Sequence, residues 1–382
     1  MNRKTEGVTD MEKLLRFRVL EGQSLLGKHL DESSLFSSPR WLKVMNGRIE
    51  GKNFMFLLEK ASCPVMMVHG SILDSPTSYN AYNPYDLMLA EEPVFPINEK
   101  IAARRSVLRQ VTRREDWFPC LILMWPGYEC TMAGQEYSNV QMMRILIREI
   151  ASWAQSKGLK LIGYLYVPED KNDFTNVLAE QGYQKFPLTY KSELRLLGNS
   201  FDDYINGLKK KQRSGIKREI QFLYEAGVKT EVCPLNESGE DLLRLRIKLV
   251  RKYGNYSSLD EEYRRLERLK DAFSSEDLLV ARAMADGDLI GFTLFLQHKD
   301  FLYAFWTGTD YEHPKSSFVH FDTAFYSVIP KAYRLGIIKI GYGIGHWQGK
   351  KRRGCDVTAV DGWLLGIHSF VQMTLKQLKE EY

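Results

Sequence analysis

The feature that most constrains the fold of this chain is a short pattern that occurs twice, 178 residues apart from Ala154 to Ala332. In each copy an apolar helical stretch ends at a glycine and an apolar strand follows directly. The copies share five residues at one constant spacing: Ala154, Gly158, Ile162, Gly163 and Tyr164 match Ala332, Gly336, Ile340, Gly341 and Tyr342. This repetition predicts a duplicated fold.

The length of the chain agrees with a duplication. Its 382 residues exceed what one ordinary core needs and fit two domains of typical size. Apolar residues make up 44% and charged residues 26%, which is typical of a folded globular chain. We therefore predict two domains, residues 1–198 and 199–382, and place the candidate active site in the second.

Periodicity within each half predicts a mixed central sheet flanked by helices, an α+β fold. In the first half it predicts strands at 54–58, 64–68, 120–125, 159–167 and 190–197, with helices at 138–157 and 172–180. In the second half it predicts strands at 278–285, 289–297, 301–307 and 337–340, and a helix over 317–334 kinked at Pro330. The Asp-Gly turn at 286–287 indicates a hairpin.

Several classes of protein are disfavoured by the sequence. No apolar run reaches about 18 residues, so no membrane span is predicted. The charged stretch 1–17 lacks the apolar core of a secretory signal. Five scattered cysteines form no CxxC pair, which predicts neither disulfides nor a metal site and favours a reducing, cytoplasmic location. The net charge of +5 does not by itself indicate nucleic acid.

Two basic clusters lie in the second half. On a predicted helix Lys210, Arg213 and Lys217 share one face, opposite an apolar stripe. Such a face either holds the phosphate backbone of an RNA or keeps the helix soluble. The second cluster, 350–354, follows a glycine-rich run, so Lys350 and Arg353 either contact an anionic donor or form a solvated surface.

Candidate catalytic residues lie at the start of the predicted helix at 317–334. His320 is either a general base or a histidine packed within the fold, and Asp322 either orients an amine or charges the helix terminus. Tyr326 lies four residues after Asp322, on its face, and lines a pocket or packs in the core. The same two interpretations are open for two pairs of residues, Tyr303 and Trp306 on a strand and Asn83 and Tyr85 in a loop predicted at 80–89.

Three segments resemble a known group of proteins. They are residues 201–228, the run Val319-His320-Phe321-Asp322 with Tyr326, and the run Gly343-Ile344-Gly345-His346 with Lys350, Arg353 and Gly354. In this order they are similar to the double-GNAT proteins, which include the Fem peptidyltransferases and the peptidoglycan biosynthesis/recognition acetyltransferase-like families. In the first half the likeness is carried by the runs SPRWL at 38–42 and NPYDL at 83–87.

The resemblance implies tandem GNAT-like domains and a transferase that moves an aminoacyl group from aminoacyl-tRNA to an amine, forming an amide bond. The acceptor is then a small-molecule or peptide amine, no cofactor is permanently bound, and His346 joins the donor site. In this sequence three residues separate His346 from Lys350, which are usually adjacent in the family.

Two other functions remain open, an acyl-CoA-dependent N-acyltransferase and a non-catalytic binding module. Acyl-CoA GNATs hold the pyrophosphate with a glycine-rich turn before a helix. The corresponding stretch here, 310–317, contains no glycine. The sequence therefore favours aminoacyl-tRNA over acyl-CoA as the donor.

Overall fold

The computed structural model describes residues 14–22, 34–235, 239–252 and 257–382. The chain forms two compact units, unit 1 from residues 1–189 and 358–382, and unit 2 from residues 190–357. This division differs from the predicted ranges because the C-terminal residues 358–382 pack with the N-terminal half. The stretch 1–17, for which the sequence predicts no secretory signal, lies mostly outside the described residues. No helix among those described is long and apolar enough to cross a membrane.

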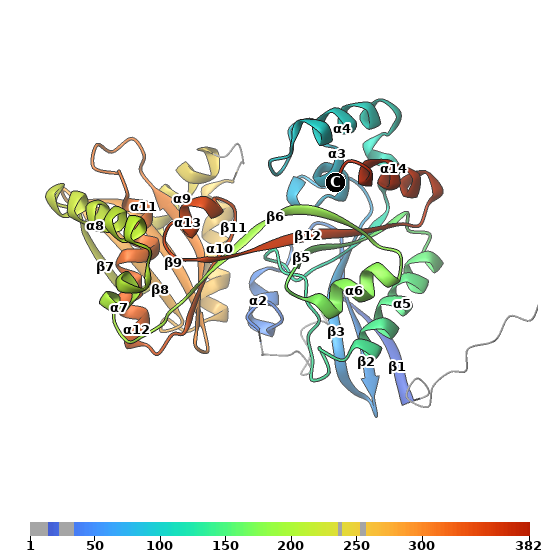
Figure 1. The fold of residues 1–382 in the computed structure, drawn as a ribbon. Helices are drawn as coiled ribbons and strands as arrows, with labels where there is room; N and C mark the ends of the chain where they lie inside the picture. The colour runs from blue at the N-terminus through green and yellow to red at the C-terminus, as the bar shows by residue number, and fades with distance from the viewer. Residues whose placement is uncertain (1–13, 23–33, 236–238, 253–256) are drawn as a thin grey trace, which may run out of the picture. The chain divides into compact units, whose positions relative to one another are not determined.

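Unit 1 contains a mixed sheet with strand order β1-β2-β3-β4-β5-β12, in which only β4 and β5 pair in parallel. Helices α5 and α6 pack together and α5 contacts β2 and β3, whereas α3, α4 and α14 form a separate group (Figure 1). The strands are β1 (Leu15–Glu21), β2 (Lys52–Lys60), β3 (Cys63–Leu73), β4 (Cys120–Leu123), β5 (Leu161–Pro168) and β12 (Asp356–Gly366). The helices are α2 (Pro39–Val44), η2 (Asn80–Tyr82), α3 (Pro84–Leu89), α4 (Glu99–Val111), η3 (Arg114–Trp117), α5 (Val140–Ser156), α6 (Asn172–Glu180) and α14 (Ser369–Lys379).

Unit 2 repeats this plan with strand order β6-β11-β10-β9-β8-β7, in which only β10 and β11 pair in parallel. Its strands are β6 (Gln184–Arg195), which begins in unit 1, β7 (Lys229–Pro234), β8 (Leu278–Ala285), β9 (Asp288–His298), β10 (Phe301–Thr309) and β11 (Lys339–Ile344). Its helices are α7 (Phe201–Gly207), α8 (Lys210–Glu225), α9 (Glu240–Lys252), α10 (Leu259–Ala272), α11 (Val319–Phe321), η4 (Asp322–Tyr326), α12 (Val328–Arg334) and α13 (Trp347–Lys351).

The repeated sequence pattern has the same geometry in both units. Gly158 and Gly336 end their helices with a φ of 69°, a left-handed conformation that glycine adopts without strain. In each case the residue after the glycine donates its N–H to the alanine of the pattern, Leu159 to Ala154 and Ile337 to Ala332. The next strand then enters parallel to its neighbour, with Leu121 opposite Ile162 and Leu302 opposite Ile340. The two units therefore repeat one plan, as the tandem of GNAT-like domains predicted from the sequence requires.

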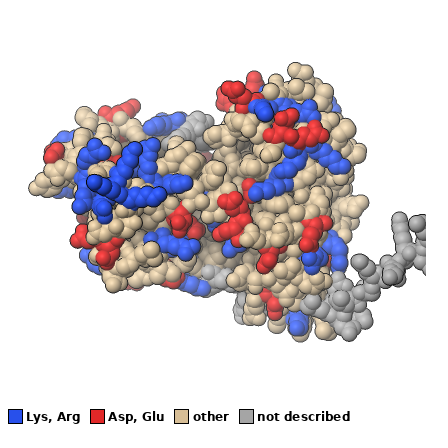
Figure 2. All heavy atoms as spheres, viewed as in Figure 1, with Lys and Arg blue, Asp and Glu red and all other residues tan. Residues whose placement is uncertain are grey.

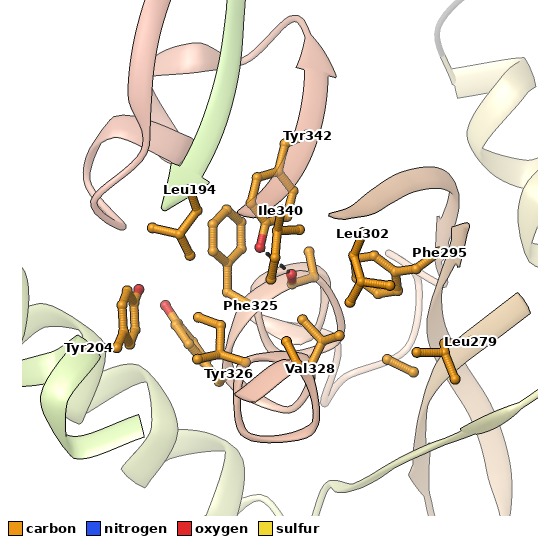
Figure 3. Packing of buried hydrophobic residues seen from close by; sticks show 14 of the residues in the cluster. Leu194, Tyr204, Leu279, Phe295, Leu302, Phe325, Tyr326, Val328, Ile340 and Tyr342 are labelled. Atoms are coloured by element: carbon orange, nitrogen blue, oxygen red, sulfur yellow. Dashed lines mark hydrogen bonds between the residues drawn. The ribbon is translucent and has the colours of Figure 1, made fainter. Parts of the chain in front are cut away.

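The core of unit 2 lies between its sheet and the helical segment that follows β10 (Figure 3). Phe325 stacks on Tyr342 with ring centroids 4.1 Å apart, and the Tyr342 hydroxyl donates to the Ala324 carbonyl at 2.9 Å. Because buried aromatic rings remove a large apolar area from water, this packing fixes the helical segment against β11.

Most predicted elements are present, and two differ. The stretch 80–89, predicted as a loop, forms η2 and α3, because the Asn83 side chain caps the helix by accepting from the Tyr85 N–H at 3.0 Å. The helix predicted over 317–334 is divided into α11, η4 and α12, and Pro330 lies in the first turn of α12. Its irregularity lies earlier, in η4, which is a π turn in which the Ser327 N–H donates to the Asp322 carbonyl at 3.1 Å.

Candidate functional site

The candidate site of unit 2 begins where β10 and β11 stop pairing. Their parallel ladder covers only Phe301–Tyr303 and Lys339–Gly341, although β10 continues to Thr309. Irregularities in the register of β10 and β11 occur at this point. The carboxyl ends of neighbouring parallel strands are where sheets of this kind commonly place ligands.

His320 lies beside this end of β10. Its Nδ1 is 3.2 Å from the Thr307 hydroxyl, and in the tautomer in which Nδ1–H donates, Nε2 presents a lone pair. Burial first, and then the positive charges of Lys350, Arg353 and His346, lower the pKa of His320 to about 4. His320 is therefore neutral at pH 7, as a proton acceptor must be. Lys350, Arg353 and His346 therefore lie close enough to His320 to influence its charge.

Asp322 and Tyr326 both belong to η4, but they have different partners. The Thr230 hydroxyl on β7 donates to the Asp322 carboxylate at 2.5 Å. Burial raises the pKa of Asp322 above its ordinary value, and the Thr230 hydrogen bond opposes that change. Tyr326 instead donates its hydroxyl to Glu219 on α8. A π turn has a wider spacing than an α-helix, so the i,i+4 relation predicted for these two residues does not apply.

Arg353 is buried, with 3% of its surface exposed. Its guanidinium pairs with Glu219, donates from Nε to the Tyr326 hydroxyl at 2.8 Å, and donates from Nη1 to the Gly349 carbonyl at 2.9 Å. The guanidinium carbon also lies 3.1 Å from the centre of the Phe321 ring. Predicted as a donor-binding residue, Arg353 is already fully engaged. We interpret it as a positioning residue that joins α8, η4 and the loop after β11.

Lys350 fixes the end of β11. Its ammonium donates to the carbonyls of Tyr342 at 2.6 Å and Ile344 at 3.1 Å, and burial lowers its pKa to about 8. His346 lies between β11 and α13 and is the N-cap residue of α13. Its side chain is exposed, and its backbone is left-handed with a φ of 44°. Gly343 and Gly345 also have positive φ, which explains the local need for glycine.

The other predicted site residues lie elsewhere. Trp306 is buried on the face of β10 that α9 covers, with the Arg246 guanidinium over its ring. Tyr303 is half-buried beside Gly341. Asn83 and Tyr85 belong to unit 1, where both are buried and serve the capping of α3. Of the predicted residues, His346, Lys350 and Arg353 therefore lie near His320. Tyr326 is connected to this group by its hydrogen bond from Arg353.

Three residues of the site were not predicted: Thr307, Thr230 and Glu219. Glu219 carried a usable signal, because it falls on the inward stripe of α8 with Ile216 and Leu223, both of which are buried. An acid on the apolar face of a basic helix indicates a buried partner of opposite charge. The two threonines carry no such signal.

The two predicted basic clusters form one surface (Figure 2). The Gln212 side chain at the start of α8 donates to the Lys351 carbonyl of α13 at 2.9 Å, so the two segments adjoin. The exposed basic residues of this surface are Lys209, Lys210, Lys211, Lys217, Arg218, Lys351 and Arg352, and Arg213 is half-buried. We call these eight residues the α8–α13 basic face.

The burial of His320 makes stability depend on pH. The folded pKa of about 4 lies below the ordinary 6.5, so the unfolded chain takes up a proton as the pH falls through 6.5 while the folded chain stays neutral. The free energy of unfolding is therefore expected to fall by up to about 3 kcal/mol between pH 6.5 and pH 4. His69, buried in unit 1 with a pKa of about 4, adds a loss of the same sign.

Denaturant unfolding at a series of pH values measures this dependence. The variants His320→Gln and His69→Gln should each flatten the curve in that interval, and the double variant should flatten it most. A curve that is equally steep in all four proteins would contradict a neutral His320 in the folded chain.

Comparison with known proteins agrees with this architecture. The sequence profile of the FemAB-like family, described as peptidoglycan biosynthesis/recognition, matches residues 111–382. No curated protein matches the sequence.

Among solved structures, FemX has the same fold at low sequence identity. The crystal structure of FemX superposes with a TM-score of 0.58 at 10% identity and covers 93% of this chain and 99% of its own. L-PGS from Bacillus licheniformis gives 0.47 at 11% identity, covering 69% and 82%. A tandem GNAT protein from the clavulanic acid biosynthesis pathway gives 0.48 at 8% identity, covering 92% and 98%. With a family profile that covers most of its length, the chain belongs to the FemAB-like family.

Proposed function

We propose that this protein is an aminoacyltransferase that moves an aminoacyl group from aminoacyl-tRNA to the amine of a small-molecule or peptide acceptor. The observation that carries the proposal is the α8–α13 basic face and its attachment to the site around His320. Gln212 ties α8 to α13, and Glu219 on α8 binds both Arg353 and Tyr326. The phosphodiester backbone of an RNA is the kind of ligand that such a cluster of cations attracts.

The segment before α11 supports the same donor. In an acyl-CoA GNAT this segment holds the pyrophosphate. Here Asp310 and Glu312 both pair with Lys248, and Lys315 pairs with Asp286. These ion pairs leave acidic groups at the position and engage Lys315, which is unfavourable for a pyrophosphate.

For aminoacyl transfer the protein must position the two substrates and assist proton transfer. The acceptor nitrogen attacks the carbonyl carbon of the aminoacyl ester, the new C–N bond forms, and the C–O bond to the ribose breaks. In our proposal, Nε2 of neutral His320 accepts the proton that the nitrogen loses, and that proton passes to the leaving ribose oxygen. This step requires the tautomer in which Nδ1–H donates to the Thr307 hydroxyl and Nε2 carries the lone pair.

Charge reversal on α8 tests the donor. The double variant Lys210→Glu, Lys217→Glu should bind aminoacyl-tRNA more weakly and reduce the slope of log affinity against log salt concentration by about 2, because two phosphate contacts are lost. The matched control reverses two exposed lysines of unit 1, Lys100→Glu and Lys171→Glu. Filter binding and transfer of a labelled aminoacyl group measure both proteins.

Other outcomes would favour the alternatives. Tight binding of acyl-CoA together with no binding of aminoacyl-tRNA would overturn the proposal in favour of an acyl-CoA-dependent N-acyltransferase. Binding of neither donor, with no transfer activity, would indicate a binding module.

A further inference from the structure

Two aromatic side chains are exposed at the edge of the candidate site. Phe222 on α8 and Phe318 immediately before α11 keep 41% and 39% of their surfaces exposed. Their rings meet edge to face, with centroids 5.5 Å apart. Phe318 is two residues from His320, and Phe222 lies one helical turn after Glu219, so both elements that carry the pair also carry site residues. Large apolar rings left in water beside a site indicate a surface that binds something.

The backbone at Phe318 has a conformation that is energetically unfavourable for a bulky residue. Its φ is 65°, in the left-handed region that glycine adopts readily and bulky residues rarely do. Strained backbone of this kind is found at ligand-binding and catalytic positions. Phe318 directly precedes α11, the short helix that carries His320.

The charge around the pair points to the class of ligand. Lys211, Arg218 and Phe222 are spaced by seven and four residues, which aligns them along one side of α8. On a different side of α8, Lys217 is followed seven residues later by Tyr224, which is 79% exposed. An exposed aromatic ring therefore follows exposed cations on both of these sides of α8. Proteins bind single-stranded nucleic acid with this combination, since cations follow the phosphates and rings stack on the bases.

We propose that Phe222 and Phe318 form a stacking surface for the unpaired nucleotides at the 3′ end of the donor RNA. This inference rests on the proposed function and specifies which part of the donor RNA the two rings bind. The cations of α8 contact the phosphates, and the two rings stack on the exposed bases that follow. The aminoacyl ester at the end of the strand is thereby held beside His320.

The experiment compares two RNAs, an intact tRNA and the same tRNA with its unpaired 3′ nucleotides removed. Wild type, Phe222→Leu and Phe318→Leu are titrated with each RNA at one fixed salt concentration. Phe222→Tyr is the matched control, because it retains the aromatic face that leucine lacks. Circular dichroism and thermal unfolding check the fold, which half-exposed positions should tolerate.

We expect each leucine variant to bind intact tRNA about tenfold more weakly and trimmed tRNA as well as wild type does, with Phe222→Tyr close to wild type. If the leucine variants bind both RNAs with wild-type affinity, or lose the same amount of affinity for both, the stacking surface is wrong. The proposed donor would be unaffected by that result. Wild type that binds neither RNA would reject the proposed function and this inference together. Binding to vesicles of anionic phospholipid that depends on Phe222, without RNA binding, would show instead that the surface meets a membrane.

Discussion

Replacement of His320 by glutamine is expected to reduce kcat/KM for aminoacyl transfer by about 10²- to 10⁴-fold, the range typical of a lost general base. Glutamine approximates the shape of the ring and retains a hydrogen-bonding group near Thr307, but it accepts no proton. The expectation follows from the burial that keeps His320 uncharged at pH 7 and from its position where β10 and β11 separate.

The measurement is a steady-state transfer assay, accompanied by donor binding. Affinity for aminoacyl-tRNA should stay within about threefold of wild type, because the α8–α13 basic face is untouched. Thr307→Val, which removes only the partner of Nδ1, should cost less than His320→Gln. A His320→Gln enzyme with unchanged kcat/KM would exclude His320 as the base and direct attention to Asp322.

The second large effect concerns stability. Arg353→Met should lower the free energy of unfolding of unit 2 by about 3 kcal/mol, because it leaves Glu219 without its buried guanidinium partner. Glu219 keeps about a fifth of its side chain exposed, so the lower end of the range for a broken buried ion pair applies. Tyr326 and Phe321 lose contacts in the same variant.

A double variant separates charge from packing. With Glu219→Met and Arg353→Met together, no charge is left unpaired, and stability should return to within about 1 kcal/mol of wild type. Denaturant unfolding monitored by tryptophan fluorescence measures wild type, Arg353→Met and the double variant. If the double variant were as unstable as Arg353→Met alone, lost packing rather than an unpaired charge would be the cause.

Helix α8 combines two roles on two sides. Its outward side carries the exposed cations and Phe222, and its inward side carries Glu219, Ile216 and Leu223. Changes on the outward side should therefore alter donor binding and leave stability nearly intact. Changes at Glu219 should do the reverse.

Local sequence patterns determined much of the fold. The helix–glycine–strand motif at Gly158 and Gly336 is encoded within a few residues, because a left-handed glycine ends a helix wherever it stands. The same holds for the hairpin at Gly287 and for the amphipathic helix α8, whose apolar spacing is set by the helical period. The sequence also placed His320 at the start of a helical segment, and its resemblance to the Fem group led to the family.

Contacts between distant residues decided the rest, and no local pattern encodes them. Strand β12 pairs with β5 in unit 1, almost 200 residues away in sequence, so the domain division could not be read from the order of elements. In the sequence, Arg353 belongs to a run of basic residues of the kind expected on a surface. In the folded protein it is buried against Glu219, 134 residues earlier in the chain. Burial depends on which surfaces meet. The sequence therefore determined the two repeated units and the basic helix, whereas only the tertiary structure made Arg353 a structural centre and Thr307 the partner of His320.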